Sequence, residues 1–109
     1  MLWLDYLAYF FGGVFLANTI PHLVNGISGR PFQSPFSSPP GQGLSSSFLN
    51  VVWALINLII AYLLVLRVGS FDLHDNADII VFGIGFAAMA LALSRAFGRF
   101  HGGNNPLNK

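Results

Sequence analysis

The chain has 109 residues, of which 54% are hydrophobic and only 8% are charged, and its formal net charge is +1. A soluble domain is roughly a quarter charged, so these few charges cannot cover the surface of a water-soluble fold. They also exclude the basic surface that binds nucleic acid, and the absence of cysteine excludes thiolate metal sites. We therefore expect an all-α membrane protein, a single integral membrane domain over residues 1–109 with three transmembrane helices.

The first span is predicted at about residues 2–22. Its sequence, LWLDYLAYFFGGVFLANTI, is long enough to cross roughly 30 Å of hydrocarbon at 1.5 Å per residue. Pro21 predicts the end of this helix or a kink in it. No lysine or arginine precedes the apolar run, which argues against a cleaved signal peptide. Gly12 and Gly13 thin the middle of the span and predict close packing against another helix.

A long Pro/Ser/Gly-rich loop is predicted between the first and second helices, over residues 25–47. Glycine and proline break helices there, and serine supplies local hydrogen bonds to the backbone. A flexible linker of this composition normally has no large apolar side chains, yet this loop contains Phe32 and Phe36. We interpret both as anchors at the membrane interface or against the helix ends. The alternative is a loop that gates a substrate or docks a partner.

The second span, residues 48–66, is the strongest of the three. Thirteen of its residues are Phe, Leu, Ile or Val, and together they favour insertion by several kcal/mol. The turn that follows contains Asp75 and Asn76, either of which can cap the next helix, with Asp78 placed favourably in its first turn. The alternative is a metal cluster of Asp72, His74, Asp75 and Asp78. We favour capping and predict neither a metal site nor a cofactor.

The third span is predicted at residues 78–97, followed by a short polar tail over 98–109. Arg95 lies near its end, where a long side chain can extend toward the lipid headgroups. Gly83 and Ala87 are small residues four apart, which predicts close helix packing. Because three helices leave much of their surface to lipid, we expect such faces to join other subunits. The predicted partners are the lipid bilayer and a homo-oligomer or larger membrane complex.

Polar residues in the predicted helices suggest one site. If helical geometry persists through Pro21, then Asn18, His22 and Asn25 share one face of the first helix. Asn50 and Asn57, seven residues apart, share one face of the second. The predicted ligand-binding pocket lies at the cytoplasmic interface and consists of Asn18, His22, Asn25, Asn50, Asn57 and Arg95.

This pocket has two interpretations. In the structural one, the amides bond across helices and Arg95 faces lipid phosphates. In the functional one, His22 exchanges protons, and the amides with Arg95 orient an anionic or polar headgroup.

The few cations predict the orientation, because lysine and arginine near span ends stay on the cytoplasmic side. Four of the five lie in the first loop and the C-terminal tail, and only Arg67 lies on the other side. We therefore expect a bacterial inner (cell) membrane protein with an external N-terminus and a cytoplasmic C-terminus.

The sequence is compatible with three functions. The leading one is an accessory or scaffold subunit of a membrane assembly, without enzymatic activity. The alternatives are a small oligomeric transporter or channel, and a lipid- or quinone-binding protein or enzyme with a polar site at the cytoplasmic interface. Small multidrug transporters are similar in length, but they have four helices and a membrane-embedded glutamate in the first, where this chain has only Asp5.

Overall fold

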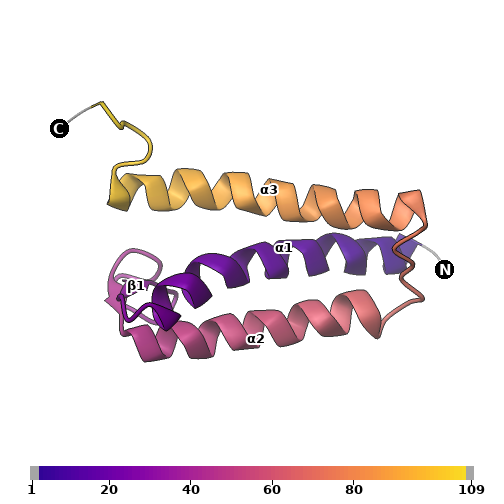
Figure 1. Ribbon diagram of the computed structural model, residues 1–109, viewed down its shortest axis with the longest axis horizontal. Coiled ribbons are helices and arrows are strands. Elements are labelled where there is room, and N and C mark those ends of the chain that lie inside the picture. Colours follow the sequence, from indigo (N-terminus) through magenta and orange to yellow (C-terminus); the bar gives the residue numbers. More distant parts are fainter. Residues whose placement is uncertain (1–2, 108–109) are drawn as a thin grey trace.

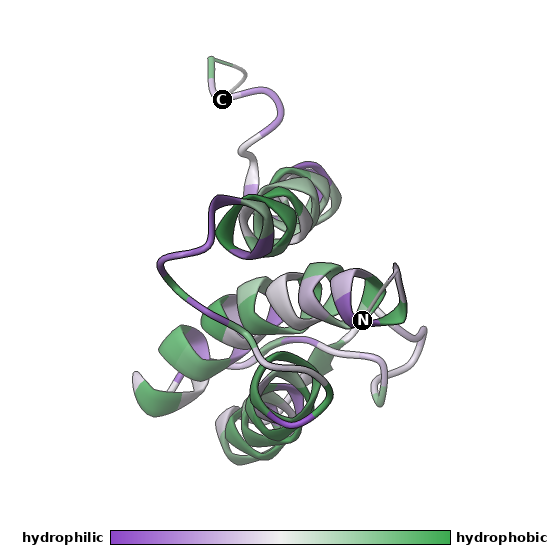
Figure 2. Cartoon of the chain, turned by 90° about the vertical axis from the view of Figure 1, so that its right-hand side faces the viewer, coloured by the Kyte–Doolittle hydropathy of each residue, from purple (hydrophilic) through white to green (hydrophobic). Residues whose placement is uncertain are grey.

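The computed structural model describes residues 3–107 and is built from three long helices, of which the second runs antiparallel to the first and the third. They are α1 (Trp3–Ile27), α2 (Ser47–Leu66) and α3 (Asn76–His101), and the loop after α1 contains two short strands, β1 (Phe32–Gln33) and β2 (Leu44–Ser45). Helix α1 lies between α3 and α2, as the side view and the end view both show (Figures 1 and 2). The central helix therefore supplies the packing surface for both of the others.

All three helices are long and apolar enough to cross a membrane. This agrees with the predicted number of spans. Large apolar side chains cover the outside of the molecule, including Phe48 at 78% exposed and Leu91 at 70%. The helices are mostly hydrophobic in Figure 2, and hydrophilic residues gather in the segments that connect them. Such extensive apolar exposure is unusual for a protein in water.

Two helices extend beyond the predicted spans. Helix α1 continues through Pro21 to Ile27, so the loop begins later than residue 25. The Asn25 side chain lies within this last part of α1 and donates to the Pro21 carbonyl at 2.8 Å. Helix α3 likewise runs to His101, beyond the predicted end at 97, and stops where Gly102 adopts a left-handed backbone with φ of 82°. The polar tail is therefore shorter than expected.

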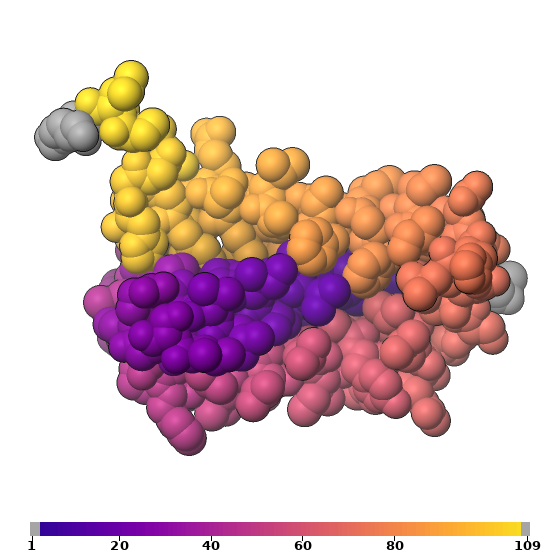
Figure 3. Space-filling model, viewed as in Figure 1, coloured from indigo at the N-terminus to yellow at the C-terminus, as the bar shows by residue number. Residues whose placement is uncertain are grey.

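Glycines let α1 approach both of its neighbours closely. A Cβ on Gly12 would overlap the Val65 side chain of α2, and one on Gly13 would overlap the Phe82 carbonyl of α3. Adjacent helix residues point about 100° apart, so this pair serves two different interfaces. Figure 3 shows α1 exposed as a strip between the other two helices.

On α3, the glycine that packs closely against α1 is Gly85. A Cβ on Gly85 would overlap the Phe10 carbonyl of α1. Nothing in the described part of the chain lies within 4 Å of a Cβ built on Gly83, and Ala87 is exposed. Gly83 and Ala87 therefore do not pack against α1 or α2, and contact with another subunit stays a prediction for them.

The loop between α1 and α2 is folded against the helix ends. Its two strands are antiparallel, with Phe32 opposite Ser45, and the Ser34 and Ser45 hydroxyls are 2.5 Å apart. Ser46 then caps α2 by accepting the Leu49 N–H at 3.1 Å. Because these bonds fix the loop backbone, its side chains take defined positions beside the helices.

The turn between α2 and α3 caps a helix, as predicted. Asp75 is the N-cap of α3, and its carboxylate accepts the N–H groups of Ala77 and Asp78. Asp78 in turn accepts the Asp72 N–H at 3.0 Å. Within residues 3–107, no three His, Cys, Asp or Glu side chains come together as metal ligands. In this structure the carboxylates of Asp72, Asp75 and Asp78 accept backbone N–H groups of the turn and of the first turn of α3.

Candidate ligand-binding site

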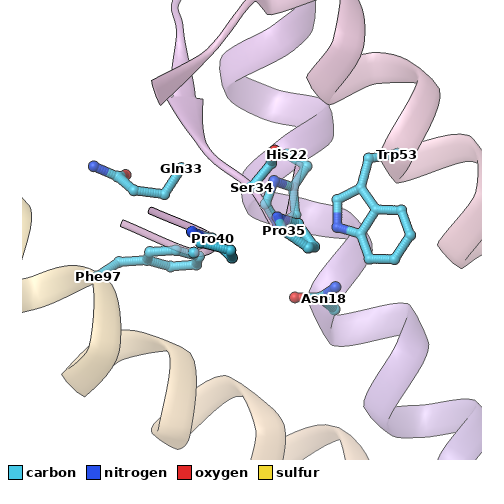
Figure 4. Close-up of a pocket in the computed structure, with 9 residues that line it drawn as sticks. Asn18, His22, Gln33, Ser34, Pro35, Pro40, Trp53 and Phe97 are labelled. Carbon is cyan, nitrogen blue, oxygen red and sulfur yellow. The ribbon is translucent and has the colours of Figure 1, made fainter. Parts of the chain in front are cut away.

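A cavity of about 340 Å³ lies at the end of the bundle where the folded loop meets all three helices (Figure 4). Cavities of this size are at the lower end of the range for small-molecule sites. The surface of this one is mostly apolar, with a few polar side chains among the lining residues. It is lined by Asn18, His22, Gln33, Ser34, Pro35, Pro40, Gly41, Trp53 and Phe97.

His22 is held in the cavity wall by Asn50. The His22 Nδ1 lies 2.7 Å from Asn50 Oδ1, and both residues are almost fully buried. The Asn50 amide nitrogen donates to the backbone carbonyls of Phe32, Ser45 and Ser46. The amide oxygen must therefore be the atom that faces His22, so His22 Nδ1 carries the proton and Nε2 is an acceptor in the neutral ring.

Aromatic rings surround the His22 imidazole. The ring centroids of Phe32, Phe97 and Trp53 lie 5.6, 5.9 and 6.5 Å away, each edge to face. These rings come from the loop, from α3 and from α2, so three separate segments form the aromatic surroundings of the imidazole. Such an environment excludes water from the imidazole and suits a ligand with a flat or apolar body.

A second polar chain fixes the Asn18 side chain. Its amide nitrogen donates to Asn57 Oδ1 at 3.0 Å, and the Asn57 nitrogen donates to the Trp53 carbonyl at 2.8 Å. The Asn18 oxygen is left as an acceptor, and in Figure 4 it points toward the space between Trp53 and Phe97. Asn57 does not line the cavity but orients the residue that does.

Trp53 presents a buried donor to the same cavity. Its indole Nε1 is buried and has no hydrogen-bond partner in the part of the chain that the structure describes. A buried donor without a partner costs about 1–3 kcal/mol. In Figure 4 the nitrogen-bearing edge of Trp53 faces His22 and Pro35 across the cavity. The cavity therefore offers one N–H donor and two acceptors, His22 Nε2 and Asn18 Oδ1.

Two residues of the predicted pocket lie elsewhere. Asn25 bonds to Pro21 of its own helix and accepts from Arg30 at 3.2 Å. Arg95 is exposed and lies beside Ser94 and Asn104 on the far side of α3. The prediction that Arg95 orients an anionic headgroup beside His22 does not fit this geometry. Among residues 3–107, no charged side chain lines the cavity.

The two predicted loop anchors differ from each other. Phe32 is buried between the rings of Phe97 and His101, tilted against the first and stacked on the second at 5.1 Å. Phe36 is 57% exposed and meets only the ring of Trp53, at 5.2 Å. Phe32 therefore holds the loop in place, whereas Phe36 covers the outer side of Trp53.

Sequence reasoning missed the contribution of Gln33, Phe97 and His101. The Gln33 side chain reaches His101 at 2.8 Å, across 68 positions of sequence. His101 falls within the predicted polar tail, but it is the last residue of α3 and its ring stacks on Phe32 of the loop. Its place one turn beyond Phe97 on a helix is the only sequence signal for this contact.

No family model, curated protein or solved structure matches this chain. Its function must therefore be inferred from the cavity and the surfaces themselves.

Proposed function

We propose that this chain is an integral membrane protein that binds a neutral, oxygen-bearing head group of a lipid or quinone in the cavity beside His22. The observation that carries the proposal is the buried Trp53 Nε1, a donor without a partner in residues 3–107 that faces the cavity. A ligand carbonyl or hydroxyl oxygen would satisfy it. This function was an alternative at the level of sequence, and the cavity favours it over a purely accessory role.

The lining chemistry supports a neutral ligand. Asn18 and His22 offer acceptors, so hydroxyl groups of a reduced quinone or of a glycerol-based lipid can donate to them. The aromatic side chains of Trp53 and Phe97 in the cavity wall suit a ring or an acyl chain next to that head group. Because the described residues that line the cavity are all uncharged, an anionic head group would lose its hydration without an ionic partner among them.

The proposed topology puts this cavity at the cytoplasmic interface. The folded loop and the end of α3 lie at the same end of the bundle (Figure 1), and they contain Arg30, Arg95 and Arg99. Lysine and arginine near span ends favour the cytoplasmic side. A ligand that partitions into the inner leaflet then has its head group at the depth of the cavity.

The test is an inventory by mass spectrometry of lipids and quinones that copurify in mild detergent. Trp53→Phe removes the indole N–H, keeps an aromatic ring and breaks none of the side-chain hydrogen bonds of the described chain. We expect at least about a tenfold loss of one retained species, because a buried hydrogen bond contributes about 1.5 kcal/mol when its partner would otherwise be unpaired.

Trp3→Phe is the matched control, since Trp3 lies at the opposite end of the bundle and is 70% exposed. It should keep the bound species at the level of the unsubstituted protein. Equal retention by all three proteins, or no specific species in any of them, contradicts the proposal.

We further propose that the chain assembles with copies of itself through the outer face of α3. Gly83 and Ala87 form a face of small residues that neither α1 nor α2 covers, and such faces allow close approach of helices in lipid. The chain has no cysteine, so Ala87→Cys supplies a single crosslinking site. We expect disulfide-linked dimers of Ala87→Cys in membranes but not of Ile59→Cys, which is exposed on α2; the opposite pattern contradicts this interface.

A further inference from the structure

A second cavity, of about 530 Å³, lies at the opposite end of the bundle and has a different chemistry. It is bounded by the start of α1, by the turn after α2 and by the first turn of α3. Its surface is largely polar, and none of the described residues that line it is basic. The lining residues are Asp5, Tyr6, Tyr9, Val68, Gly69, Ser70 and Asp78.

Tyr9 is the observation that indicates a ligand. The residue is only 3% exposed, and its hydroxyl has no hydrogen-bond partner among residues 3–107. A Cβ built on Gly69 would lie 2.5 Å from this hydroxyl and 2.8 Å from the Asp5 carboxyl carbon. The hydroxyl and the carboxylate therefore face the same small volume, which stays open because position 69 has no side chain.

Two carboxylates border this volume, and within residues 3–107 no basic side chain shares the cavity wall with them. Asp78 is 7% exposed, and one of its oxygens accepts the Asp72 N–H. Asp5 lies on α1, one turn before Tyr9. Two acidic groups in a partly dry site attract a positive charge, because Coulomb energy grows as the effective dielectric falls.

The size of the cavity and its walls select the kind of cation. Proteins bind calcium or magnesium with several oxygens at roughly 2.0–2.6 Å, a shell far smaller than this cavity. The residues that the structure describes also contain no group of three acidic or histidine ligands. The Tyr9 ring contacts Tyr6 and Phe71 edge to face at 6.1 and 5.0 Å, so aromatic surface lies beside the carboxylates. Aromatic surface next to carboxylates suits an organic cation.

From this geometry we infer that the cavity binds a primary ammonium group attached to an organic body. A primary ammonium has three N–H donors, which match the carboxylates of Asp5 and Asp78 and the hydroxyl of Tyr9. The group comes either from a free alkylamine or from the ethanolamine head group of a lipid, since the cavity lies at the end of the apolar helices. The site is separate from the cavity beside His22 and does not depend on it.

The chain contains three tyrosines, two of which line the cavity, so tyrosine is a direct reporter. The experiment labels the protein with 3-fluorotyrosine in detergent and follows the fluorine NMR spectrum while butylammonium chloride is added. We expect saturable shifts of the Tyr6 and Tyr9 resonances and none for Tyr62, which lies on α2 outside the cavity. Equal shifts of all three, or no saturation, would overturn the inference.

Variants locate the binding. Asp5→Asn should weaken butylammonium binding at least tenfold, because hydrogen bonds to charged groups contribute about 1.5–3 kcal/mol. Tyr9→Phe, read from the Tyr6 resonance, should also weaken it, and Gly69→Ala should block it by filling the opening. Asp72→Asn also removes one carboxylate, at a position in the turn between α2 and α3 that does not line the cavity, and should leave the dissociation constant within twofold. Equal binding by Asp5→Asn and Asp72→Asn rejects the site.

Two further additions define the ligand. The first addition is calcium or magnesium chloride. If either salt shifts the Tyr6 and Tyr9 resonances at lower concentrations than butylammonium does, the inference of an organic cation is wrong. In phosphatidylcholine nanodiscs, adding phosphatidylethanolamine distinguishes the sources. If phosphatidylethanolamine shifts the Tyr6 and Tyr9 resonances and butylammonium reverses the shifts by competition, the ligand is a lipid head group. If only butylammonium shifts them, the ligand is a free amine.

Discussion

Asn50 has the largest structural role of any single side chain near the cavity. It is fully buried, contacts His22 and donates to three backbone carbonyls that join the loop to α2. These bonds connect the fold of the loop to the orientation of the imidazole. A defect at Asn50 therefore affects both the position of the loop and the ligand cavity.

We expect Asn50→Ala to destabilise the protein by at least about 2 kcal/mol, because several buried groups lose their partner at once. The measurement is the apparent midpoint of thermal unfolding in detergent, which should fall by roughly 8 °C or more. Asn105→Ala, an exposed position in the tail, is the control and should change the midpoint little. Equal midpoints for the two variants contradict the structural role of Asn50.

The polar residues show what sequence spacing can predict about the site and what it cannot. The i, i+4 relation of Asn18 and His22, and the seven-residue spacing of Asn50 and Asn57, place each pair on one helix face. The cross-helix pairs, Asn18 with Asn57 and His22 with Asn50, depend on how α1 and α2 rotate against each other. Arg95 shows the same limit, since its depth was foreseen but the face of α3 that contains it points away from the cavity.

At the scale of elements, α1 is central because its glycines allow close approach on two sides. Gly12 faces α2 and Gly13 faces α3, while Gly85 of α3 meets the backbone of α1. Close backbone approach is important in a bilayer. There, moving an apolar side chain from lipid into a helix interface lowers the free energy little, because lipid tails are equally apolar. The order of the helices thus depends on small residues more than on large ones.

Gly13→Leu should separate α1 from α3 and destabilise the fold by about 1–3 kcal/mol, the usual cost of overpacking. Gly83→Leu is the control. It adds the same side chain to α3, at a position where no other described residue lies within 4 Å of the new Cβ. It should leave the unfolding midpoint of the monomeric fraction close to that of the unsubstituted protein. A larger loss with Gly83→Leu than with Gly13→Leu would show that the helices pack on different faces.

The turn before α3 gives a smaller, local prediction. Asp75→Ala removes the side-chain acceptor for the Ala77 and Asp78 N–H groups and should cost about 1 kcal/mol. Asp75→Asn keeps a capping acceptor and should restore most of that stability. Thermal unfolding of the two variants checks this, and an identical loss in both would assign the effect to charge instead of capping.

At the scale of the whole molecule, the two ends of the bundle differ in chemistry. The end with the folded loop contains arginines and a mostly apolar cavity, and the other contains Asp5, Asp72, Asp75 and Asp78. Arg67 is at this acidic end, whereas Arg30, Arg95 and Arg99 are at the end with the folded loop. This asymmetry supports the proposed orientation, with the folded loop in the cytoplasm.

Single cysteines test this orientation directly, since the chain has none of its own. Ser70→Cys lies in the turn after α2 and Asn105→Cys in the tail, and both positions are exposed. A membrane-impermeant maleimide added to intact cells should label Ser70→Cys and reach Asn105→Cys only after lysis. The reverse labelling pattern would invert the topology and place the His22 cavity outside.

The sequence alone determined that three apolar helices form and that a short capped turn joins the last two, because length, continuous hydrophobicity and local capping act within each segment. It did not determine that α1 lies in the middle or that the loop folds over His22. It also could not show that Trp53 Nε1 and the Tyr9 hydroxyl face cavities without a partner in the described chain. Those features depend on helix rotation and on contacts such as Gln33 with His101, which join distant segments and which no local pattern encodes.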